Sequence, residues 1–199
     1  MLPEPLKQLA TVLAKLPGIG PRQALRLAFY LSGEERNLIF EIDSAISAMS
    51  QVKLCSDCFY PHTNKNKLCS ICESPARMKN IIAIVEKATD LMSIEKTKRF
   101  NGRYLVLGDL GKNGIMEPEQ KLRLDTLKKY ITKEFGGEAE EIVLAVSPTS
   151  YGDLNASMLH RELSTLTKKL TRLGRGIPTG GEIEFADEET LGAAIDRRV

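Results

Sequence analysis

The sequence lacks any long hydrophobic run. Its longest apolar stretches, such as residues 81–85 and 142–146, are far shorter than the roughly 20 residues that a membrane-spanning helix needs. The beginning of the chain also lacks an apolar stretch behind a basic start, the pattern typical of an export signal. These absences argue against a membrane protein and an exported protein, so we expect no membrane partner and a cytoplasmic location.

Strong overall charge is also lacking. The formal net charge is +2 over 199 residues, too little to indicate a polyanionic partner by itself. The charge is unevenly distributed, with +3 over residues 1–33, +3 over 53–79, +4 over 160–176 and −4 over 177–199. Such patches can attract nucleic acid in one region and a basic partner in another, although solvated helix surface explains any single patch equally well.

All four cysteines lie in one short segment, and none is left over. Cys55 and Cys58 form one Cys-x2-Cys pair, and Cys69 and Cys72 form the second. Two such pairs can bring four thiolates to one tetrahedral Zn²⁺. The segment has little apolar material, and structural zinc would stabilise it by on the order of 10 kcal/mol. The spacing therefore predicts a structural zinc module, whose closed four-thiolate site leaves no position for a substrate.

Two disulfides or a redox-active pair are the alternatives to zinc. Disulfides need an oxidising compartment, for which the sequence contains no export signal. Two redox pairs side by side would be unusual. His62 lies between the pairs, and we interpret it as a loop residue because four thiolates already fill the coordination shell.

Helical spacing dominates the first third of the chain. Leucines at positions 6, 9, 13 and 16 predict an amphipathic helix. Residues 17–21 interrupt it, and Pro21 suits the first turn of a second helix that ends at Gly33. Apolar residues at positions 39, 42, 46 and 49 predict a third helix.

After residue 79, short apolar runs alternate with helical patterns. Strands are predicted at 81–85, 104–107 and 142–146, with a weaker edge strand near 170–173. Helices are predicted at 88–98, at 124–135 and through the leucines at 159, 163, 166 and 170. A last helix is predicted from Asp187, with Leu191 and Ile195 facing inward. Strands that are apolar on both faces and alternate with helices predict a parallel sheet covered on both sides.

The segment LPGIGPRQALRL joins the first two predicted helices. Gly18 and Gly20 permit a tight turn and a close approach of the backbone to a ligand. The helix that follows has free N–H groups at its start, which together with the helix dipole can bind a phosphate. Lys15, Arg22 and Arg26 add positive charge around this turn. The pattern indicates a helix-hairpin-helix element that binds the nucleic-acid backbone without reading sequence; an ordinary helical corner is the alternative.

Acidic residues follow the predicted strands. Glu86 and Asp109 come directly after the first two runs, and Asp153 lies seven residues beyond the third. Sites often form at the carboxyl ends of parallel strands, where these carboxylates could hold Mg²⁺ for a nuclease, primase or strand-passing enzyme. Tyr151 would be the candidate nucleophile, although a packing role is more usual for such a tyrosine. Helix capping or surface charge explains Glu86 and Asp153 at least as well.

Taken in order, four motifs resemble the RecR family of bacterial recombination mediators over nearly the whole chain. LPGIGPRQALRLAFYL is similar to the family's helix-hairpin-helix, CSDC…CSIC to its zinc motif, IIAIVEKATDLMSIEKTKRFNGRYLVLGD to the first half of its Toprim domain, and LTRLGRGIPTGGEIEFADEETLGAAIDRR to its C-terminal segment. The resemblance implies an α/β fold with a helix-hairpin-helix region (1–52), a zinc finger (53–79), a Toprim-like parallel-sheet domain (80–175) and a C-terminal helical segment (176–199).

The resemblance also implies a DNA-repair clamp and not an enzyme. Members of the family form rings around DNA, so a homo-oligomer, as a dimer or a tetrameric ring, is expected. They work with RecO, and in some bacteria RecF, to help load the strand-exchange recombinase onto single-stranded DNA. Arg22 and Arg26 fall at the family's DNA-contacting positions, the four cysteines fall on its zinc ligands, and Glu86 falls on its first Toprim glutamate.

The chain departs from the family pattern after the third apolar run. The family commonly has Asn-Pro-Thr-Val-Glu-Gly-Glu where this sequence has SPTSYGD, so Tyr151 replaces one carboxylate and Asp153 shortens the other. The loss of carboxylates weakens the expected Mg²⁺ site and any partner contact through these acids. A Mg²⁺-dependent Toprim-type enzyme and a scaffold that binds only protein remain the alternative functions.

Overall fold

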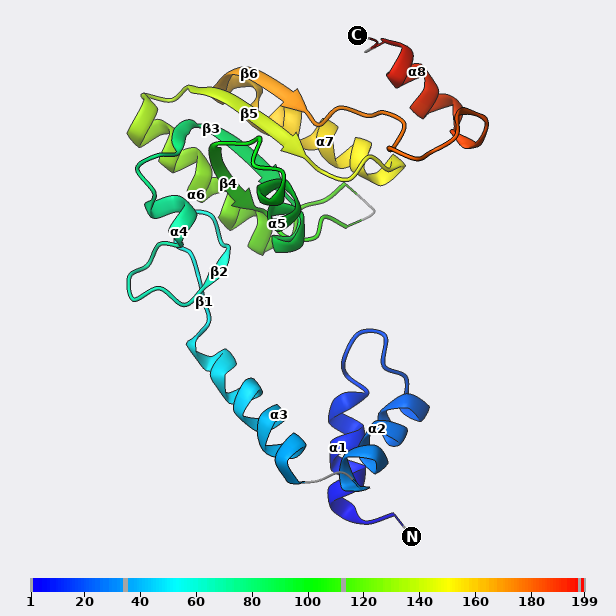
Figure 1. Cartoon of the computed structure of the whole chain (residues 1–199). Coiled ribbons are helices and arrows are strands. Elements are labelled where there is room, and N and C mark those ends of the chain that lie inside the picture. The colour runs from blue at the N-terminus through cyan, green and yellow to red at the C-terminus, as the bar shows by residue number, and fades with distance from the viewer. Residues whose placement is uncertain (1, 34–35, 112–113, 197, 199) are drawn as a thin grey trace. The chain divides into compact units, whose positions relative to one another are not determined.

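The computed structural model describes residues 2–33, 36–111, 114–196 and 198. The chain forms two compact units, Met1–Val52 and Lys53–Val199, which are drawn together in Figure 1. No helix of the described residues is long and apolar enough to cross a membrane.

The N-terminal unit consists of three helices. These are α1 (Glu4–Leu13), α2 (Pro21–Gly33) and α3 (Arg36–Ala48), and a 3₁₀ turn, η1 (Met49–Gln51), follows the third. Helices α1 and α2 pack against each other. Ala24 and Ala28 are fully buried on one face of α2, and their small side chains allow this close approach. The three predicted helices are therefore confirmed, although α1 ends before Leu16, which lies in the turn.

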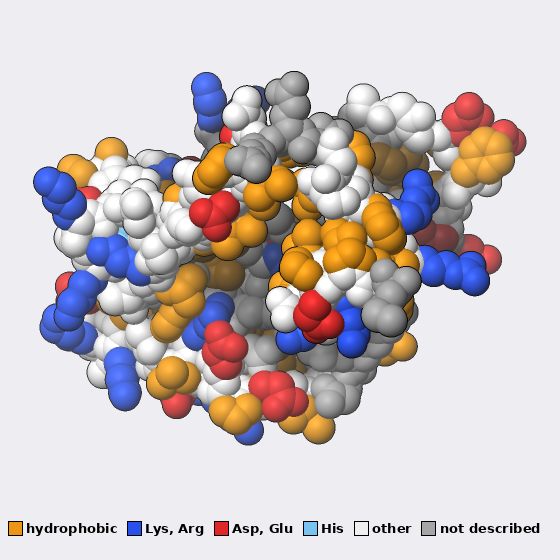
Figure 2. All heavy atoms as spheres, turned by 90° about the horizontal axis from the view of Figure 1, so that it is seen from below, with side chains coloured by type: hydrophobic (Ala, Val, Ile, Leu, Met, Phe, Trp, Pro, Cys, Tyr) orange, Lys and Arg blue, Asp and Glu red, His pale blue; other side chains and the backbone are white. Residues whose placement is uncertain are grey.

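Much of the apolar surface of this unit remains exposed. The apolar stripe of α3 and η1 is accessible to solvent, with Phe40 70% and Ile46 67% exposed. Figure 2 shows groups of hydrophobic side chains on the face of the molecule seen from below. An exposed apolar stripe of this kind is typical of an interaction surface.

A four-stranded parallel sheet organises the second unit. Its strands are β3 (Met78–Val85), β4 (Gly102–Val106), β5 (Ala139–Ala145) and β6 (Thr167–Arg172), in the order β4-β3-β5-β6. The register pairs Ile82 with Ile142 and Ile84 with Leu144, so that the most apolar segments lie at the centre. The predicted parallel sheet is confirmed, and so is the edge position of its last strand.

Helices cover both faces of this sheet, as the apolar character of both strand faces predicts. On one face, Ile82 and Ile84 pack against α6 (Pro118–Phe135) and α7 (Ser150–Leu163); on the other, Val85 packs against α5 (Ala88–Lys96). Helix α6 ends at Gly136, whose positive φ of 68° suits glycine.

Two predictions about the last third of the chain are wrong. The helix through the leucines ends at Leu163, a 3₁₀ turn, η2 (Ser164–Leu166), follows, and Leu170 belongs to β6. Pairing with β5 overrides the helical spacing, because the threonines and lysines of β6 suit an edge strand. Ile195 in α8 (Glu188–Asp196) is 60% exposed, whereas Leu191 is partly buried.

The remaining elements are short. A two-stranded antiparallel ribbon, β1 (Lys53–Leu54) with β2 (Pro61–His62), and helix α4 (Ser70–Glu73) carry the cysteines, and a 3₁₀ turn, η3 (Ile183–Phe185), precedes α8.

Candidate metal centre and nucleic-acid interface

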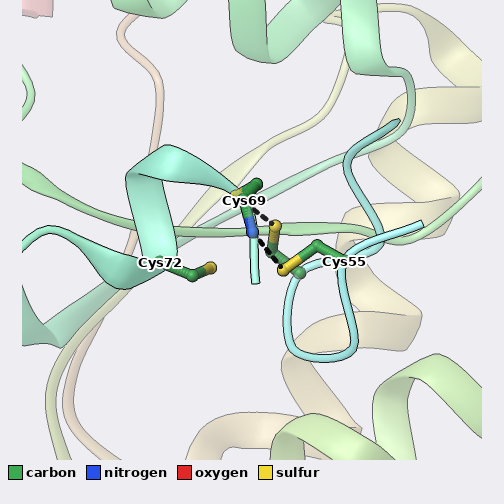
Figure 3. A group of neighbouring side chains, drawn as sticks. Cys55, Cys69 and Cys72 are labelled. Atoms are coloured by element: carbon green, nitrogen blue, oxygen red, sulfur yellow. Dashed lines mark hydrogen bonds between the residues drawn. The ribbon is translucent and has the colours of Figure 1, made fainter. Parts of the chain in front are cut away.

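The four cysteine thiols converge on one buried point. Their sulfur atoms all lie within 4.8 Å of one another, and Figure 3 shows the sulfurs of Cys55, Cys69 and Cys72 pointing toward one another. The distance between the sulfurs of Cys58 and Cys69 is 3.5 Å. Four soft ligands gathered in this way fit a tetrahedral metal ion such as Zn²⁺.

Two backbone turns bring the thiols together. In the first, Cys55 N–H donates to the carbonyl of Tyr60 and Phe59 N–H donates to the carbonyl of Cys55, with Phe59 held at a φ of +59°. In the second, α4 begins directly after Cys69, whose own N–H donates to the sulfur of Cys55 at 3.3 Å. Backbone N–H groups that donate to sulfur favour the thiolate form that a metal requires.

The four thiols influence one another's ionisation. Hydrogen bonds with Cys55 and Cys69, together with burial, hold the pKa of Cys58 far above its ordinary value. Hydrogen bonds from the other three thiols hold the pKa of Cys55 below its ordinary value. Ionisation of all four thiols therefore needs a compensating positive charge, which a divalent metal supplies.

His62 lies outside this group, as expected. Its Nδ1 accepts a 3.1 Å hydrogen bond from the N–H of Asn64, whereas its Nε2 is buried and has no hydrogen-bond partner in the described part of the chain.

The cysteine module is joined to the free edge of β4. Val106 N–H donates a 2.8 Å hydrogen bond to the carbonyl of Cys58. Arg103, also in β4, forms a 2.7 Å ion pair with Asp57 between the first two cysteines. Arg123 of α6 lies over the ring of Phe59 at 5.0 Å. The cysteine knuckle (residues 55–72) and the sheet therefore form one packed structure.

Sequence reasoning did not single out Arg103. Burial opposes its charge, but the Cys72 thiol and the Asp57 carboxylate outweigh burial and raise its pKa above the ordinary value. A signal was present in the sequence, because an arginine stands inside the apolar run that forms β4.

The structure does not bring the three strand-end acids into one metal-binding group. Among the described residues, the four cysteines are the only cluster of three or more candidate ligands. Glu86 is nearly buried and accepts a long, 3.5 Å hydrogen bond from Ser147 N–H, whereas Asp109 is exposed. Asp153 instead forms ion pairs with Arg172 and Arg175. Both arginines lower the pKa of the Asp153 carboxyl, and the hydrogen bond from Arg172 has the larger effect.

The hairpin between α1 and α2 is open to solvent. Gly18 has a φ of +80°, which favours glycine, whereas Gly20 has an ordinary φ and a Cβ added there would meet no atom within 4 Å. The first backbone bond at the start of α2 runs from Ala24 N–H to the carbonyl of Gly20. The preceding N–H groups at this helix start therefore face outward.

Three basic side chains surround this hairpin. Lys15, Arg22 and Arg26 are exposed, and in the portion of the chain that is described none of them forms an ion pair. A glycine turn, outward N–H groups and free cations together fit a phosphate backbone.

Comparisons with known proteins agree with this architecture. Family models match residues 6–49 (RecR, helix-hairpin-helix), 80–174 (Toprim domain) and 176–199 (RecR, C-terminal). Proteins named "Recombination protein RecR" from Roseiflexus sp. (strain RS-1) and Myxococcus xanthus (strain DK1622) are each 35% identical; both alignments cover 100% of this chain, and they cover 95% and 98% of the relative, respectively. The protein of that name from Rippkaea orientalis (strain PCC 8801 / RF-1) is 36% identical over 100% of this chain and 98% of its own.

This similarity extends over the full chain, includes both modules specific to RecR, and supports a role in recombinational repair. The chain therefore belongs to the RecR family of recombination proteins.

Proposed function

We propose that this protein is a sequence-independent DNA-binding clamp in recombinational repair. With RecO, and in some bacteria RecF, it would help load the strand-exchange recombinase onto single-stranded DNA. The observation that carries this proposal is the exposed hairpin of Gly18 and Gly20, followed by outward N–H groups and the exposed Arg22 and Arg26. All of these groups suit phosphate, and such contacts do not distinguish one sequence from another.

The conformation of Gly20 supports a contact with an external ligand. Its φ does not require glycine, and the protein itself places no atom within 4 Å of a Cβ there. The fold therefore does not need glycine at this position. A nucleic-acid backbone that approaches Gly20 closely would need it, because any side chain would block the approach.

We propose structural Zn²⁺ as the ion of the cysteine centre. Cys55, Cys58, Cys69 and Cys72 would all be ligands, which would leave no coordination position for a substrate. The metal would hold the two turns of the module together against the edge of β4.

A clamp of several subunits needs contact surfaces, and α3 offers one. Its exposed apolar stripe, in which Phe40 and Ile46 are the most exposed, suits burial against another copy of the chain. A dimer or a tetrameric ring is our proposal for the assembly.

We propose that the chain is divided into four segments. Residues 1–52 would bind DNA, 53–79 would form the zinc finger, 80–175 the Toprim domain and 176–199 a C-terminal segment. The protein would act in the cytoplasm, where DNA and its repair partners are found.

We propose a role without catalysis because the acids that follow the strands form no metal-binding cluster in the described residues. Glu86 and Asp153 contribute to no cluster of three candidate metal ligands in the described residues, and Asp153 is engaged by two arginines. We propose Glu86 and Asp153 as partner contacts, which a partner would make in competition with Arg172 and Arg175 for Asp153 and through the small exposed part of Glu86. Incubation with Mg²⁺ and labelled DNA tests this point, because cleavage or covalent attachment that is lost in Tyr151→Phe would establish the enzymatic alternative.

DNA binding by the hairpin is tested with Arg22→Ala/Arg26→Ala. We expect weaker binding to every DNA sequence and a shallower dependence of affinity on salt, because phosphate contacts release counterions. Lys7→Ala is the control: Lys7 is exposed in the same unit but lies eight residues before Lys15, near the other end of α1. Unchanged binding by the double variant would refute the hairpin assignment.

A further inference from the structure

Three lysines of the cysteine module (residues 53–79) form a charged surface that takes no part in holding a metal. Lys53 lies in β1, whereas Lys65 and Lys67 lie in the loop between β2 and α4. All three side chains are exposed to solvent. We refer to Lys53, Lys65 and Lys67 together as the lysine patch.

Hydrogen bonds bring the three lysines together. The Lys53 ammonium donates a 3.0 Å hydrogen bond to the backbone carbonyl of Lys65. The backbone N–H of Ser56 donates a 3.0 Å hydrogen bond to the carbonyl of Lys67. The loop therefore folds back onto the segment that begins at Lys53, and charges that are distant in the sequence become neighbours.

Other side chains hold this loop in shape. The side-chain amide of Asn64 donates to the carbonyl of Leu68 at 2.9 Å, and that of Asn66 donates to the carboxylate of Glu73. The ammonium groups of Lys65 and Lys67 form no ion pair with any described residue. The loop therefore does not use these two charges for its own conformation.

The acids of the module are paired with other groups. Residues 53–79, all of which the structure describes, contain two carboxylates, Asp57 and Glu73. Asp57 forms a 2.7 Å ion pair with Arg103, and Glu73 accepts the hydrogen bond from Asn66. The lysine patch therefore has three like charges that no carboxylate of the module compensates, an arrangement that favours the binding of an anion.

The surroundings of the lysines indicate which anion fits. Residues 63–67 read TNKNK and contain no apolar side chain. The centre of a protein–protein interface is typically depleted of charge and rich in aromatic residues, whereas surfaces that bind nucleic acid are polar and positively charged. A phosphate backbone therefore suits the lysine patch better than an acidic protein surface does.

We propose that the lysine patch is a second phosphate-binding surface, which contacts the DNA backbone in addition to the hairpin of Gly18 and Gly20. The Lys53 ammonium, fixed by the carbonyl of Lys65, keeps two N–H donors for phosphate oxygens. This inference rests on the DNA binding proposed above, and it extends the DNA contact from the N-terminal unit to the cysteine module.

The test measures the DNA affinity of the full-length protein over a series of salt concentrations, with a duplex of random sequence. Lys65→Gln/Lys67→Gln is expected to bind more weakly, and the slope of log affinity against log salt should become shallower by about 2, because two phosphate contacts are lost. Lys53 stays in place because its ammonium also holds the loop. Lys121→Gln/Lys129→Gln is the control, because it removes the same charge from exposed positions of α6. A slope that changes equally in both variants, or in neither, would overturn the proposal.

A second measurement uses the wild-type protein and does not depend on the folding of a variant. Lysines are acetylated with an amine-reactive reagent in the presence and absence of the duplex, and mass spectrometry reads the modified positions. DNA is expected to protect Lys53, Lys65 and Lys67 and to leave Lys121 and Lys129 reactive. Equal acetylation of the lysine patch with and without DNA would exclude the contact.

Two controls identify the other roles that the lysines could have. If Lys65→Gln/Lys67→Gln loses its metal and DNA does not protect the wild-type patch, the lysines support the cysteine module itself and the proposal fails. Protection by poly-glutamate and not by DNA would assign the patch to an acidic protein, which also overturns the proposal.

Failure of this inference is distinguishable from failure of the proposed function. If the wild type binds no DNA, both fail. If Arg22→Ala/Arg26→Ala weakens DNA binding and Lys65→Gln/Lys67→Gln keeps the wild-type affinity and salt dependence, only the role of the lysine patch fails.

Discussion

The N–H of Val106 donates a 2.8 Å hydrogen bond to the carbonyl of Cys58, which joins the cysteine knuckle to the edge of the parallel sheet. Among the described strands, β4 pairs with β3 alone, so this bond satisfies a donor on its open side. An unpaired sheet edge is a site of aggregation, and the module covers it.

Removal of the metal should therefore loosen the edge of β4. With a chelator, we expect faster hydrogen exchange in residues 102–107, because the knuckle that holds Val106 loses its order. The inner strand β5 (residues 139–145) serves as the internal control and should stay protected. Equal exchange in β4 with and without chelator would show that the knuckle keeps its shape without metal.

The two glycines of the hairpin should respond differently to alanine. Gly18→Ala is expected to destabilise the N-terminal unit by about 1 kcal/mol, because a φ of +80° is strained for alanine. Gly20→Ala should leave stability unchanged and weaken DNA binding, because its methyl group would lie where the DNA backbone approaches. Thermal unfolding and fluorescence anisotropy measure the two effects; wild-type affinity in Gly20→Ala would contradict the close approach.

The stability of the sheet unit should depend on Glu95 at low pH. A hydrogen bond from Arg77 lowers the pKa of Glu95 in the folded state, against an unfolded value of about 4.3. The stabilisation is thus complete above the unfolded pKa and is lost as the pH falls through the folded pKa. Arg77→Gln should be less stable than the wild type at pH 7, and urea unfolding should show this difference shrinking below about pH 4. A difference that stays constant with pH would exclude the pair as its source.

Asp153 should hold the C-terminal segment on the sheet unit. Arg175 pairs with Asp153 of α7 and with Glu189 of α8. Asp153→Asn is expected to make residues 176–196 more susceptible to limited proteolysis while the sheet remains folded. Glu162→Gln is the control, because Glu162 pairs with Lys128 at the other end of α7. Identical cleavage of wild type and Asp153→Asn would refute this role.

Much of the architecture could be predicted because the spacing of apolar residues indicates which faces of the helices and strands are buried. The apolar run at residues 81–85 forms most of the inner strand β3, and the Cys-x2-Cys spacing predicts the converging thiols. The leucine spacing failed at Leu170, because strand pairing with β5 is a long-range contact that local periodicity does not record. The position of Arg103 depends on the docking of the module onto β4, which also joins residues far apart in the chain.

Asp153 occupies the position where the resemblance implied a carboxylate of the Toprim acidic cluster, yet in this chain it forms ion pairs with two arginines. Its side chain is partly exposed, and dissolved ions weaken such contacts. Raised ionic strength should therefore weaken the ion pairs that link Arg175 and the tail beyond Gly174 to α7, whereas the apolar interior of the sheet is insensitive to it.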